Sequence, residues 1–276
     1  MKLLIVGGHG MAGHMLVQYF KKQGRHAVFY TSRDKKDPHS LVLDVNDIHS
    51  VDVLVKAVRP DMIINAVGIL NHHADRDIIQ AYHVNGFLPH RLAALADQIH
   101  ARMIHISTDC VFKGDGTGQY TEDAVTDGDS VYAITKALGE VRSPSHLTIR
   151  TSIIGPEIRK HGIGLMHWFL NQKGVVQGYT NVRWNGVTTL ELAKAVDHYM
   201  QSDTSGLIHL AHEEPVSKYE LLLLFKEIWQ ASDTVIVPSG KMVQDRTLAV
   251  TRQDAKWSMP SYSDMLKELA EWTIIR

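Results

Sequence analysis

Two residues, Tyr132 and Lys136, have the types and the spacing needed to move a proton. On a helix, side chains four residues apart lie on the same face, so the phenol and the ammonium would point the same way. A neighbouring cation favours the phenolate, and we therefore expect Lys136 to lower the pKa of Tyr132 from its ordinary value of about 10. A phenol of this kind can give a proton to a substrate oxygen near neutral pH.

A hydroxyl group from the preceding strand would complete this arrangement. Residues 103–106 form an apolar run that stops at the polar residues 107–109, as a buried strand does where it leaves a sheet. From that place Thr108 could hold a substrate oxygen in line with the phenol. A hydroxyl, a phenol and an ammonium suit protonation of a carbonyl oxygen while a hydride reaches its carbon. The predicted catalytic residues are Thr108, Tyr132 and Lys136.

The start of the sequence supplies a candidate nucleotide site. Residues 2–6 are continuously apolar, which is typical of a buried parallel strand, and glycines follow immediately before a helical pattern. Their spacing fits both GxGxxG and GxxGxxG. Such glycines let the backbone turn tightly and approach a pyrophosphate, whose charge then faces the positive end of the helix. The residues expected in this turn are Gly7, His9, Gly10, Met11 and Gly13.

A second strand, residues 26–30, leads to Ser32 and Arg33, which we expect beside the ribose of a dinucleotide. At this position an acidic residue accepts from a free 2'-hydroxyl, whereas an arginine pairs with a 2'-phosphate. Arg33 is the first charged residue after the strand, so the sequence favours NADP(H) and leaves NAD(H) open. The remaining predicted cofactor-binding residues lie at later strand ends or on the catalytic helix: Asp44, Val45, Ala66, Val67, Gly68, Ser107, Tyr132 and Lys136.

Strands and helices alternate along the first part of the chain, which is typical of a parallel sheet with right-handed crossovers. We predict an α/β fold, with a Rossmann-type, doubly wound parallel sheet in residues 1–152 and a smaller C-terminal α/β substrate lobe in residues 153–276. In the second part glycine and aromatic residues become frequent, and short helices are expected. A helix over residues 189–201 should pack back onto the first domain.

Composition excludes several classes of protein. With a net charge of -1 and one cysteine in 276 residues, the chain has neither the basic character of a nucleic-acid-binding protein nor an internal disulfide. Its 17 histidines are scattered without a zinc-binding spacing, so no metal site is predicted. No apolar run is long enough for a membrane span and the N-terminus does not read as a signal peptide, so we expect no membrane partner and a cytoplasmic location.

The motifs together resemble those of a known family. The glycine turn, residues 107–109, Tyr132 with Lys136, and residues 150–152 are similar to those of extended short-chain dehydrogenase/reductases, and within these to the dTDP-4-dehydrorhamnose reductase family. The resemblance implies reduction of the 4-keto group of a nucleotide-linked 6-deoxyhexose by NADPH or NADH, in deoxysugar or cell-surface polysaccharide biosynthesis. It also implies that Tyr132 donates the proton, Lys136 holds the nicotinamide ribose and Thr108 orients the ketone.

The chain departs from the pattern of that family on the sugar side of the cleft. Reductases of the rhamnose pathway have a tyrosine where this chain has Cys110 and a tryptophan where it has Ile153. The cofactor and the chemistry are therefore better supported than the sugar. Trp184 and Asn185 could replace the lost aromatic contacts, although packing inside the lobe explains them equally well. The predicted substrate-binding residues are Thr108, Asp109, Cys110, Trp184 and Asn185.

Other functions remain open at this point. A nucleotide-sugar 4-epimerase would retain tightly bound NAD and consume no NADPH. A non-catalytic, NADP-binding regulatory subunit usually lacks the hydroxyl, the tyrosine or the lysine, and all three are present here. A 4,6-dehydratase is disfavoured because Cys110 does not supply the acidic group that such an enzyme needs. The sequence does not decide the oligomeric state, and a homodimer is one alternative.

Overall fold

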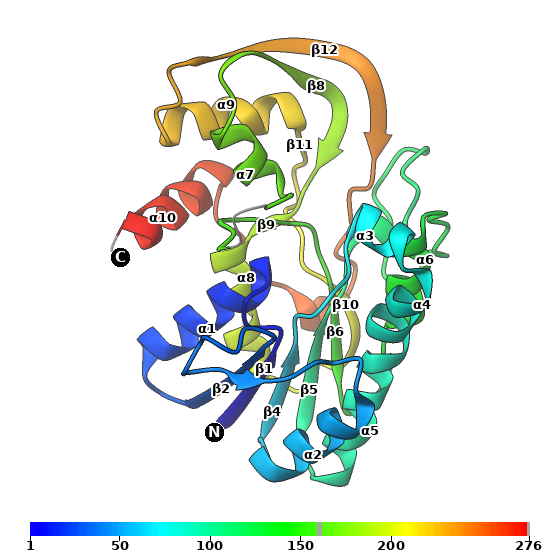
Figure 1. Cartoon of the computed structure of the whole chain (residues 1–276). Coiled ribbons are helices and arrows are strands. Elements are labelled where there is room, and N and C mark those ends of the chain that lie inside the picture. Colours follow the sequence, from blue (N-terminus) through cyan, green and yellow to red (C-terminus); the bar gives the residue numbers. More distant parts are fainter. Residues whose placement is uncertain (159–161, 275–276) are drawn as a thin grey trace.

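Seven parallel strands form one sheet at the centre of the protein, in the order β10-β6-β5-β4-β1-β2-β3 (Figure 1). The computed structural model describes residues 1–158 and 162–274. The strands are β1 (Lys2–Val6), β2 (Ala27–Ser32), β3 (Leu41–Val42), β4 (Met62–Asn65), β5 (Arg102–Ile106), β6 (Leu147–Arg150) and β10 (Gly206–His209). Because the chain runs outward from β1 in both directions, the sheet is doubly wound, and the predicted Rossmann-type α/β fold class is confirmed.

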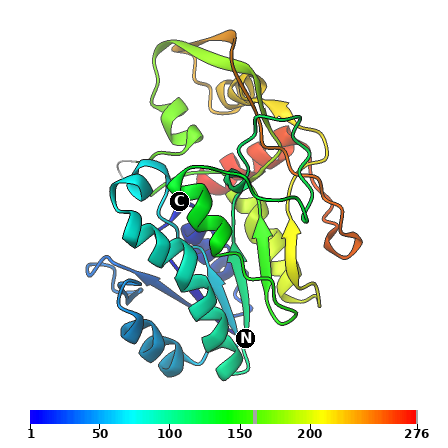
Figure 2. The same ribbon diagram turned by 90° about the vertical axis from the view of Figure 1, so that its right-hand side faces the viewer.

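Helices cover both faces of this sheet, because its strands are apolar on both sides. Along β1, alternate residues point to opposite faces, and Leu3, Leu4, Ile5 and Val6 are all buried. One face carries α1 (Met11–Gln23) and α8 (Thr189–Met200), and the other carries α2 (Ile48–Val58) and α5 (Leu88–Gln98), with α6 (Val131–Leu138) beside the turn before α5. Figure 2 shows α5 and α6 in front of the strands.

The connection between β4 and α5 is more broken than the sequence suggested. We expected one helix over residues 75–99 that Pro89 would kink or restart. The structure instead has α3 (Asn71–Arg76), α4 (Ile78–Ala81) and a π-helical turn, η1 (Tyr82–Phe87), before α5 begins. Pro89 lies in the first turn of α5, where its missing N–H breaks no helical hydrogen bond.

The second lobe is built on a three-stranded sheet, in which β8 (Gly174–Trp184) lies between β11 (Val216–Ser217) and β12 (Thr234–Asp245). The other elements of the second lobe and the short turns are α7 (Leu165–Leu170), α9 (Lys218–Ile228), α10 (Tyr262–Ile274), β7 (Ile153–Ile154), β9 (Val187–Thr188), η2 (Asp109–Val111) and η3 (Gln253–Ala255). The expectation of short helices here was wrong for residues 174–184. From residue 176 on, alternate residues of β8 are buried, except for the half-buried Thr180, and the glycine and the threonine on this face hid the period from sequence inspection.

The C-terminal part of the chain also returns to the first sheet. Strand β10 pairs in parallel with β6 and forms the edge of the seven-stranded sheet. Helix α8 packs against α1, as Figure 1 shows. A boundary at residue 152 therefore does not separate the two structural units, because residues 189–209 complete the first one.

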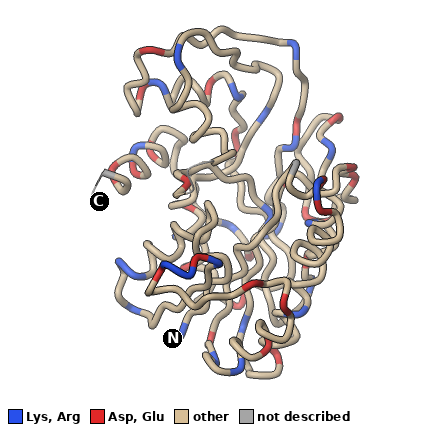
Figure 3. Tube along the Cα trace, viewed as in Figure 1, with Lys and Arg blue, Asp and Glu red and all other residues tan. Residues whose placement is uncertain are grey.

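Charged residues of both signs are distributed over the molecule. Lysine and arginine are interspersed with aspartate and glutamate in both lobes (Figure 3). None of the helices within residues 1–158 and 162–274 has the length and apolar character that a membrane span requires.

A buried ion pair joins the end of α6 to the sheet. The guanidinium of Arg150, at the end of β6, donates through Nε and Nη2 to the two carboxylate oxygens of Glu140, both at 2.7 Å. The Arg150 side chain is fully buried and the Glu140 side chain is 4% exposed. Ser107 donates to the same carboxylate at 2.8 Å, and the guanidinium lies 5.1 Å from the centre of the Phe112 ring. Strands β5 and β6 are thereby tied to the helix that carries Tyr132.

We expect Arg150→Met to lower the free energy of unfolding by about 3–5 kcal/mol, because the substitution leaves the Glu140 carboxylate buried without its partner. Arg142→Met is the matched control, since Arg142 is half-exposed and its ion pair with the exposed Asp123 spans 3.8 Å. Loss of that pair should cost less than about 1 kcal/mol. Urea unfolding of both variants measures the difference, and equal losses would contradict an anchoring role for the buried pair.

Candidate active site

The residues predicted to bind a nucleotide gather at one edge of the sheet, where the strands β1, β2, β4 and β5 end. In a doubly wound sheet this edge, near the reversal of strand order, is where ligands bind. The glycine turn follows β1, Ser32 closes β2, residues 66–68 follow β4, and Ser107 with Thr108 follow β5. The structure thus brings segments that are far apart in the sequence to one side of the molecule.

The glycine turn has the backbone geometry that close approach to a phosphate needs. Gly7 has φ of +89°, a conformation that side chains disfavour, and its N–H donates to Thr31 Oγ1 at 3.1 Å. A Cβ on Gly13 would lie 2.1 Å from the carbonyl oxygen of Gly7, so only glycine allows α1 to start this close to the strand. A Cβ on Gly10, at the N-cap, would meet nothing nearer than 3.3 Å.

The first turn of α1 therefore fits the phosphates of a dinucleotide. Its leading N–H groups have no partner within the helix. Gly10 is the N-cap, and no side-chain cap hydrogen bond is found at this helix end among the described residues. Nothing acidic stands in this first turn, so the positive end of the helix dipole is not neutralised there. The backbone at Met11 and the residues after it would hold a pyrophosphate, as the glycine pattern predicted.

An acidic residue that the sequence analysis missed, Asp37, holds the loop after β2. Its carboxylate accepts from His9 Nε2 at 2.8 Å and from the Tyr30 hydroxyl at 2.9 Å. Burial alone would raise the pKa of Asp37, but hydrogen bonds from the His39 N–H, His9 and Tyr30 outweigh burial and lower it to about 2. The predicted cofactor residue His9 thus turns its side chain to Asp37, whereas Arg33 is exposed on the same loop.

The other predicted cofactor residues differ in their exposure to solvent and in their contacts. Asp44 is exposed and accepts from the backbone and the side chain of Asn46, at 3.0 and 2.8 Å. Val67 packs against the glycine turn, because a Cβ on Gly7 would lie 2.7 Å from Val67 Cγ2. Gly68 is exposed with space around it. Val45 and Ala66 are half-buried, and the buried hydroxyl of Ser32 faces the hydroxyl of Ser40 at 2.9 Å.

The predicted catalytic residues come together where β5 ends. Helix α6 begins at its N-cap Ser130, whose hydroxyl accepts from the Ala133 N–H at 3.1 Å. This helix places both Tyr132 and Lys136 inside the protein, 8% and 3% exposed. Thr108 caps the short turn η2, where its Oγ1 accepts from the Cys110 N–H at 3.1 Å.

The pKa of Tyr132 differs from the expectation drawn from the sequence. Burial raises the pKa of the phenol well above its ordinary value, the negative charges of Cys110 and Asp109 raise it further, and a hydrogen bond with Thr108 lowers it. Lys136 does not appear among these influences, because its amine turns away toward β5. The phenol therefore stays protonated at neutral pH, as a proton donor must be, and the lowering of its pKa by Lys136 that the spacing predicted is not found.

The amine of Lys136 makes its contacts with the strand instead. Its Nζ donates to the backbone carbonyl of Ile106 at 2.8 Å and lies 3.3 Å from His105 Nε2. Burial lowers the pKa of Lys136 to about 8, and the charge of Glu140 acts in the opposite direction. A lysine of this kind changes its charge close to the neutral range.

The residues on either side of Thr108 make contacts within the protein. The hydroxyl of Ser107 donates to Glu140, so it is not directed at a nucleotide. Burial raises the pKa of the Cys110 thiol to about 12, with a further increase from the charge of Asp109, so Cys110 is not a reactive thiolate. Arg246 Nη1 lies 3.5 Å from the Cys110 sulfur and brings a cation to this place.

Trp184 and Asn185 lie inside the second lobe. Trp184 is 3% exposed, and its ring is 5.6 Å from that of Tyr262. Both amide protons of Asn185 are used, since Nδ2 donates to the carbonyls of His212 and Leu248 at 2.9 and 2.8 Å. The packing interpretation therefore describes Asn185 better than a direct contact with a sugar.

Lys218 is a further candidate, which the sequence analysis missed. It is the first residue of α9, and its Nζ lies 5.2 Å from the centre of the Trp184 ring. Burial lowers the pKa of Lys218 to about 8, while the negative charge of Asp109 acts in the opposite direction. The amine thus reaches from the second lobe toward the turn that follows Thr108. Within the described residues no carboxylate pairs with it directly.

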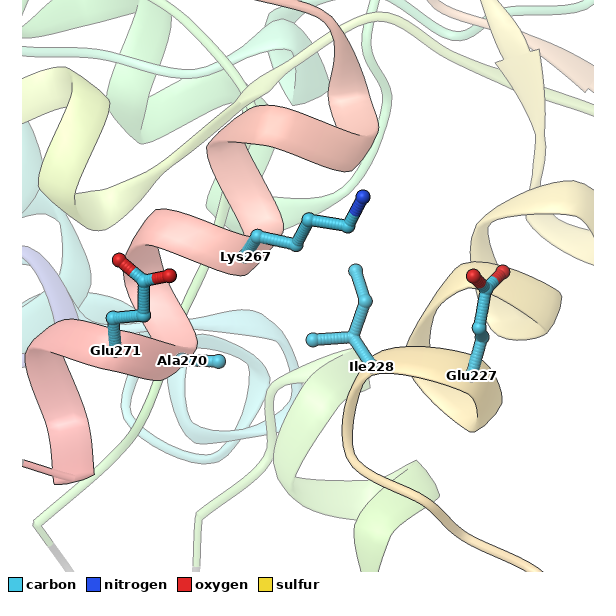
Figure 4. Close-up of a pocket in the computed structure, with 5 residues that line it drawn as sticks. All are labelled: Glu227, Ile228, Lys267, Ala270 and Glu271. Atoms are coloured by element: carbon cyan, nitrogen blue, oxygen red, sulfur yellow. The ribbon is translucent and has the colours of Figure 1, made fainter.

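Two other features of the structure do not belong to this site. A surface pocket between α9 and α10 is lined by Glu227, Ile228, Lys267, Ala270 and Glu271 (Figure 4). It contains none of the predicted site residues. Within the described part of the chain, histidine, cysteine, aspartate and glutamate do not gather in groups of three or more that could hold a metal ion.

Comparison with known proteins agrees with the arrangement at the sheet edge. The family described as "RmlD substrate binding domain" matches residues 1–273. The spore coat polysaccharide biosynthesis protein SpsK of Bacillus subtilis is 26% identical over 231 residues, which cover 82% of this chain and 78% of that protein. A dTDP-4-keto-6-deoxy-D-glucose reductase of Streptomyces niveus is 27% identical over 227 residues, covering 79% of this chain and 75% of the other.

Solved structures show the same fold. A dTDP-4-dehydrorhamnose reductase of Clostridium acetobutylicum is 22% identical and superposes with a TM-score of 0.83, covering 99% of this chain and 100% of that one. A dTDP-4-dehydrorhamnose reductase of Bacillus anthracis, solved in complex with NADP, is 18% identical with a TM-score of 0.83 and covers 99% of both chains. The match over nearly the whole length, together with the glycine turn and the buried tyrosine and lysine, shows that the chain belongs to the RmlD substrate binding domain family.

Proposed function

We propose that the protein is an NAD(P)H-dependent oxidoreductase that reduces the 4-keto group of a nucleotide-linked 4-keto-6-deoxyhexose, in deoxysugar or polysaccharide biosynthesis. The observation that carries the proposal is the buried group of Thr108, Tyr132 and Lys136 at the end of β5, beside a glycine turn built for a dinucleotide. Relatives named as reductases of dTDP-linked keto sugars support it. A cytoplasmic location is part of this proposal.

NADP(H) is the favoured cofactor. It would supply the hydride, and the residues around the turn would determine its orientation. The N–H groups at the start of α1 would hold the pyrophosphate, and Lys136 would hold the nicotinamide ribose through its amine. Arg33 is exposed and available for a 2'-phosphate, whereas the nearby Asp37 carboxylate is already engaged by His9 and Tyr30. NAD(H) would need an acidic acceptor at this position, and Asp37 is not free to be one.

The proton for the new hydroxyl comes from the phenol of Tyr132. Because burial holds its pKa high, the phenol is protonated at neutral pH and releases its proton only to an oxygen that is gaining negative charge. Thr108 directs that oxygen: its Oγ1 accepts from the Cys110 N–H, and its hydroxyl, which donates to Asp109 Oδ1 with 3.2 Å between the two oxygens, can turn to the ketone.

We expect Tyr132→Phe to lower kcat by roughly 100- to 10,000-fold, because positioned acid catalysis contributes about that much. Tyr120→Phe is the control, since Tyr120 stacks on Phe112 at 4.1 Å and should keep nearly full activity. The assay follows NADPH absorbance with enzymatically prepared nucleotide 4-keto-6-deoxysugars. One NADPH consumed per sugar supports a reductase. Sugar conversion without NADPH consumption would indicate an epimerase, and no conversion of any sugar would favour a regulatory subunit.

Arg33→Ala should weaken NADPH binding by roughly tenfold or more and leave NADH binding nearly unchanged, because a charge-assisted contact to the 2'-phosphate is lost. Lys56→Ala removes an exposed cation from the last turn of α2 and serves as the control. Fluorescence titration with both nucleotides gives the dissociation constants. Equal losses for NADPH and NADH would remove Arg33 from the site.

Lys218 is proposed as a contact to the anionic, nucleotide-linked substrate, because its amine approaches Asp109 and Cys110 from the facing lobe. Lys218→Met should raise KM for the sugar substrate by roughly tenfold with little change in kcat, since contact with a non-reacting part of the substrate contributes equally to ground and transition states. The dissociation constant of NADPH should stay as in the wild type. A fall in kcat at unchanged KM would contradict this role.

A further inference from the structure

A buried histidine stands behind the candidate catalytic lysine. His105 belongs to β5, is fully buried, and lies between Asn65 at the end of β4 and Lys136 on α6. Asn65 Nδ2 is 3.1 Å from His105 Nδ1, and His105 Nε2 is 3.3 Å from Lys136 Nζ. The three side chains form a continuous chain of polar contacts in the interior, where each donor and acceptor has to be satisfied.

The orientation of Asn65 is fixed by the backbone. The N–H of Val67 donates to Asn65 Oδ1 at 3.2 Å, and a backbone N–H has no acceptor function. The amide oxygen must therefore face Val67, and the NH₂ group must face His105. It follows that His105 Nδ1 accepts a hydrogen bond, and that the single proton of the neutral imidazole sits on Nε2.

This tautomer has a consequence for Lys136. The Nε2–H of His105 points at Nζ, but an ammonium carries donors only and cannot accept it. A neutral amine has one lone pair, so it can accept from Nε2–H while it donates to the Ile106 carbonyl at 2.8 Å. The chain of contacts is thus fully satisfied when Lys136 is neutral, and it contains two opposed donors when Lys136 is charged.

The other charged groups around the pair do not cancel this effect. Burial lowers the pKa of His105 well below its ordinary value, and the charges of Lys136 and His90 act in the same direction, so the imidazole stays neutral. Glu140 favours the ammonium of Lys136, but its carboxylate is bound by the buried guanidinium of Arg150. Tyr132, on the same helix, is neutral because of its own burial.

We propose that His105, oriented by Asn65, is a positioning residue that disfavours the ammonium form of Lys136, so that this lysine changes charge within reach of neutral pH. The inference rests on the proposed function in giving Lys136 a part in turnover. A ligand hydroxyl that accepts from Nζ would draw the amine away from Nε2–H and restore its charge. Occupation of the site and protonation of the lysine are then coupled.

The first test is the tautomer itself, read from long-range ¹H–¹⁵N correlations of histidine-labelled protein. His146 is an internal reference, because its Nδ1 accepts from the Met103 N–H at 3.2 Å and its Nε2 faces the Ala93 carbonyl at 3.1 Å. His105→Gln and His146→Gln assign the two signals. Both histidines should carry the proton on Nε2. A proton on Nδ1 of His105 overturns the proposal, and this measurement needs neither substrate nor activity.

The second test follows the charge of Lys136 through the ¹³Cε signal of labelled lysine, assigned with Lys136→Met. In His105→Gln the new amide oxygen can accept from the ammonium, so the midpoint of the titration should rise by about one pH unit or more, which is a tenfold change in the acid dissociation constant. His146→Gln, which also removes a buried imidazole, should leave the midpoint unchanged. An unmoved midpoint in His105→Gln overturns the proposal.

A second variant keeps the test independent of how well His105→Gln folds. Asn65→Asp retains an acceptor for the Val67 N–H and offers another oxygen to His105, so the imidazole proton should move to Nδ1 and leave Nε2 to accept from the lysine. A tautomer that stays on Nε2 contradicts the proposal. The alkaline limb of the kcat/KM profile should move with the spectroscopic midpoint. If the midpoint moves and the limb does not, the proposed part of Lys136 in turnover fails while the inference on His105 stands.

Discussion

The amine of Lys136 lies in the interior between α6 and β5 and donates to the carbonyl of Ile106. A buried amine cannot exchange this partner for water without a large cost, so the contact fixes the height of α6 along the strand. Tyr132 stands one turn earlier on the same helix, and Thr108 stands two residues beyond Ile106. The hydrogen bond from Lys136 to Ile106 holds the helix against the strand. The phenol and the hydroxyl therefore meet at the end of β5.

The buried pair of Glu140 and Arg150 supports the same helix from just beyond its C-terminal end. Two charges are removed from water there, and their attraction together with the hydrogen bond from Ser107 offsets the desolvation. Such a pair contributes little net stability compared with apolar packing. It does specify geometry, because a bidentate guanidinium accepts the carboxylate in one orientation only. The sheet thus fixes α6 through two contacts, the guanidinium of Arg150 on Glu140 and the Ile106 carbonyl on the amine of Lys136.

Local patterns in the sequence were sufficient for a large part of the fold. The strand, glycine turn and helix over residues 2–23 follow from apolar runs and from residues that lack a Cβ, and these are properties of adjacent positions. The caps at Ser130 and Ser217 are also local, because each serine hydroxyl accepts from the N–H three residues later. Strand β8 was missed because Gly178 and the half-buried Thr180 stand on its inner face, and the pairing that makes them a strand comes from β12, more than 50 residues later.

The site was predicted less completely than the fold, for a different reason. Spacing placed Tyr132 and Lys136 on one face of a helix, but a spacing does not say how deeply the phenol is buried or which acceptor the amine finds. Burial decided the pKa of Tyr132, and the carbonyl of Ile106 decided the direction of the lysine. The sequence analysis missed Asp37, His105 and Lys218, because their partners come from other strands or from the facing lobe.

The return of β10 to the edge of the first sheet limits how this protein can be divided. A fragment that stopped at residue 152 would leave β6 as an unprotected edge, with a row of backbone N–H and C=O groups open to pairing with another chain. It would also uncover the face of the sheet on which α8 lies. A chimaera that exchanges the second lobe with that of a relative must therefore keep residues 189–209 with their native partners, and only the segments before and after them are candidates for replacement.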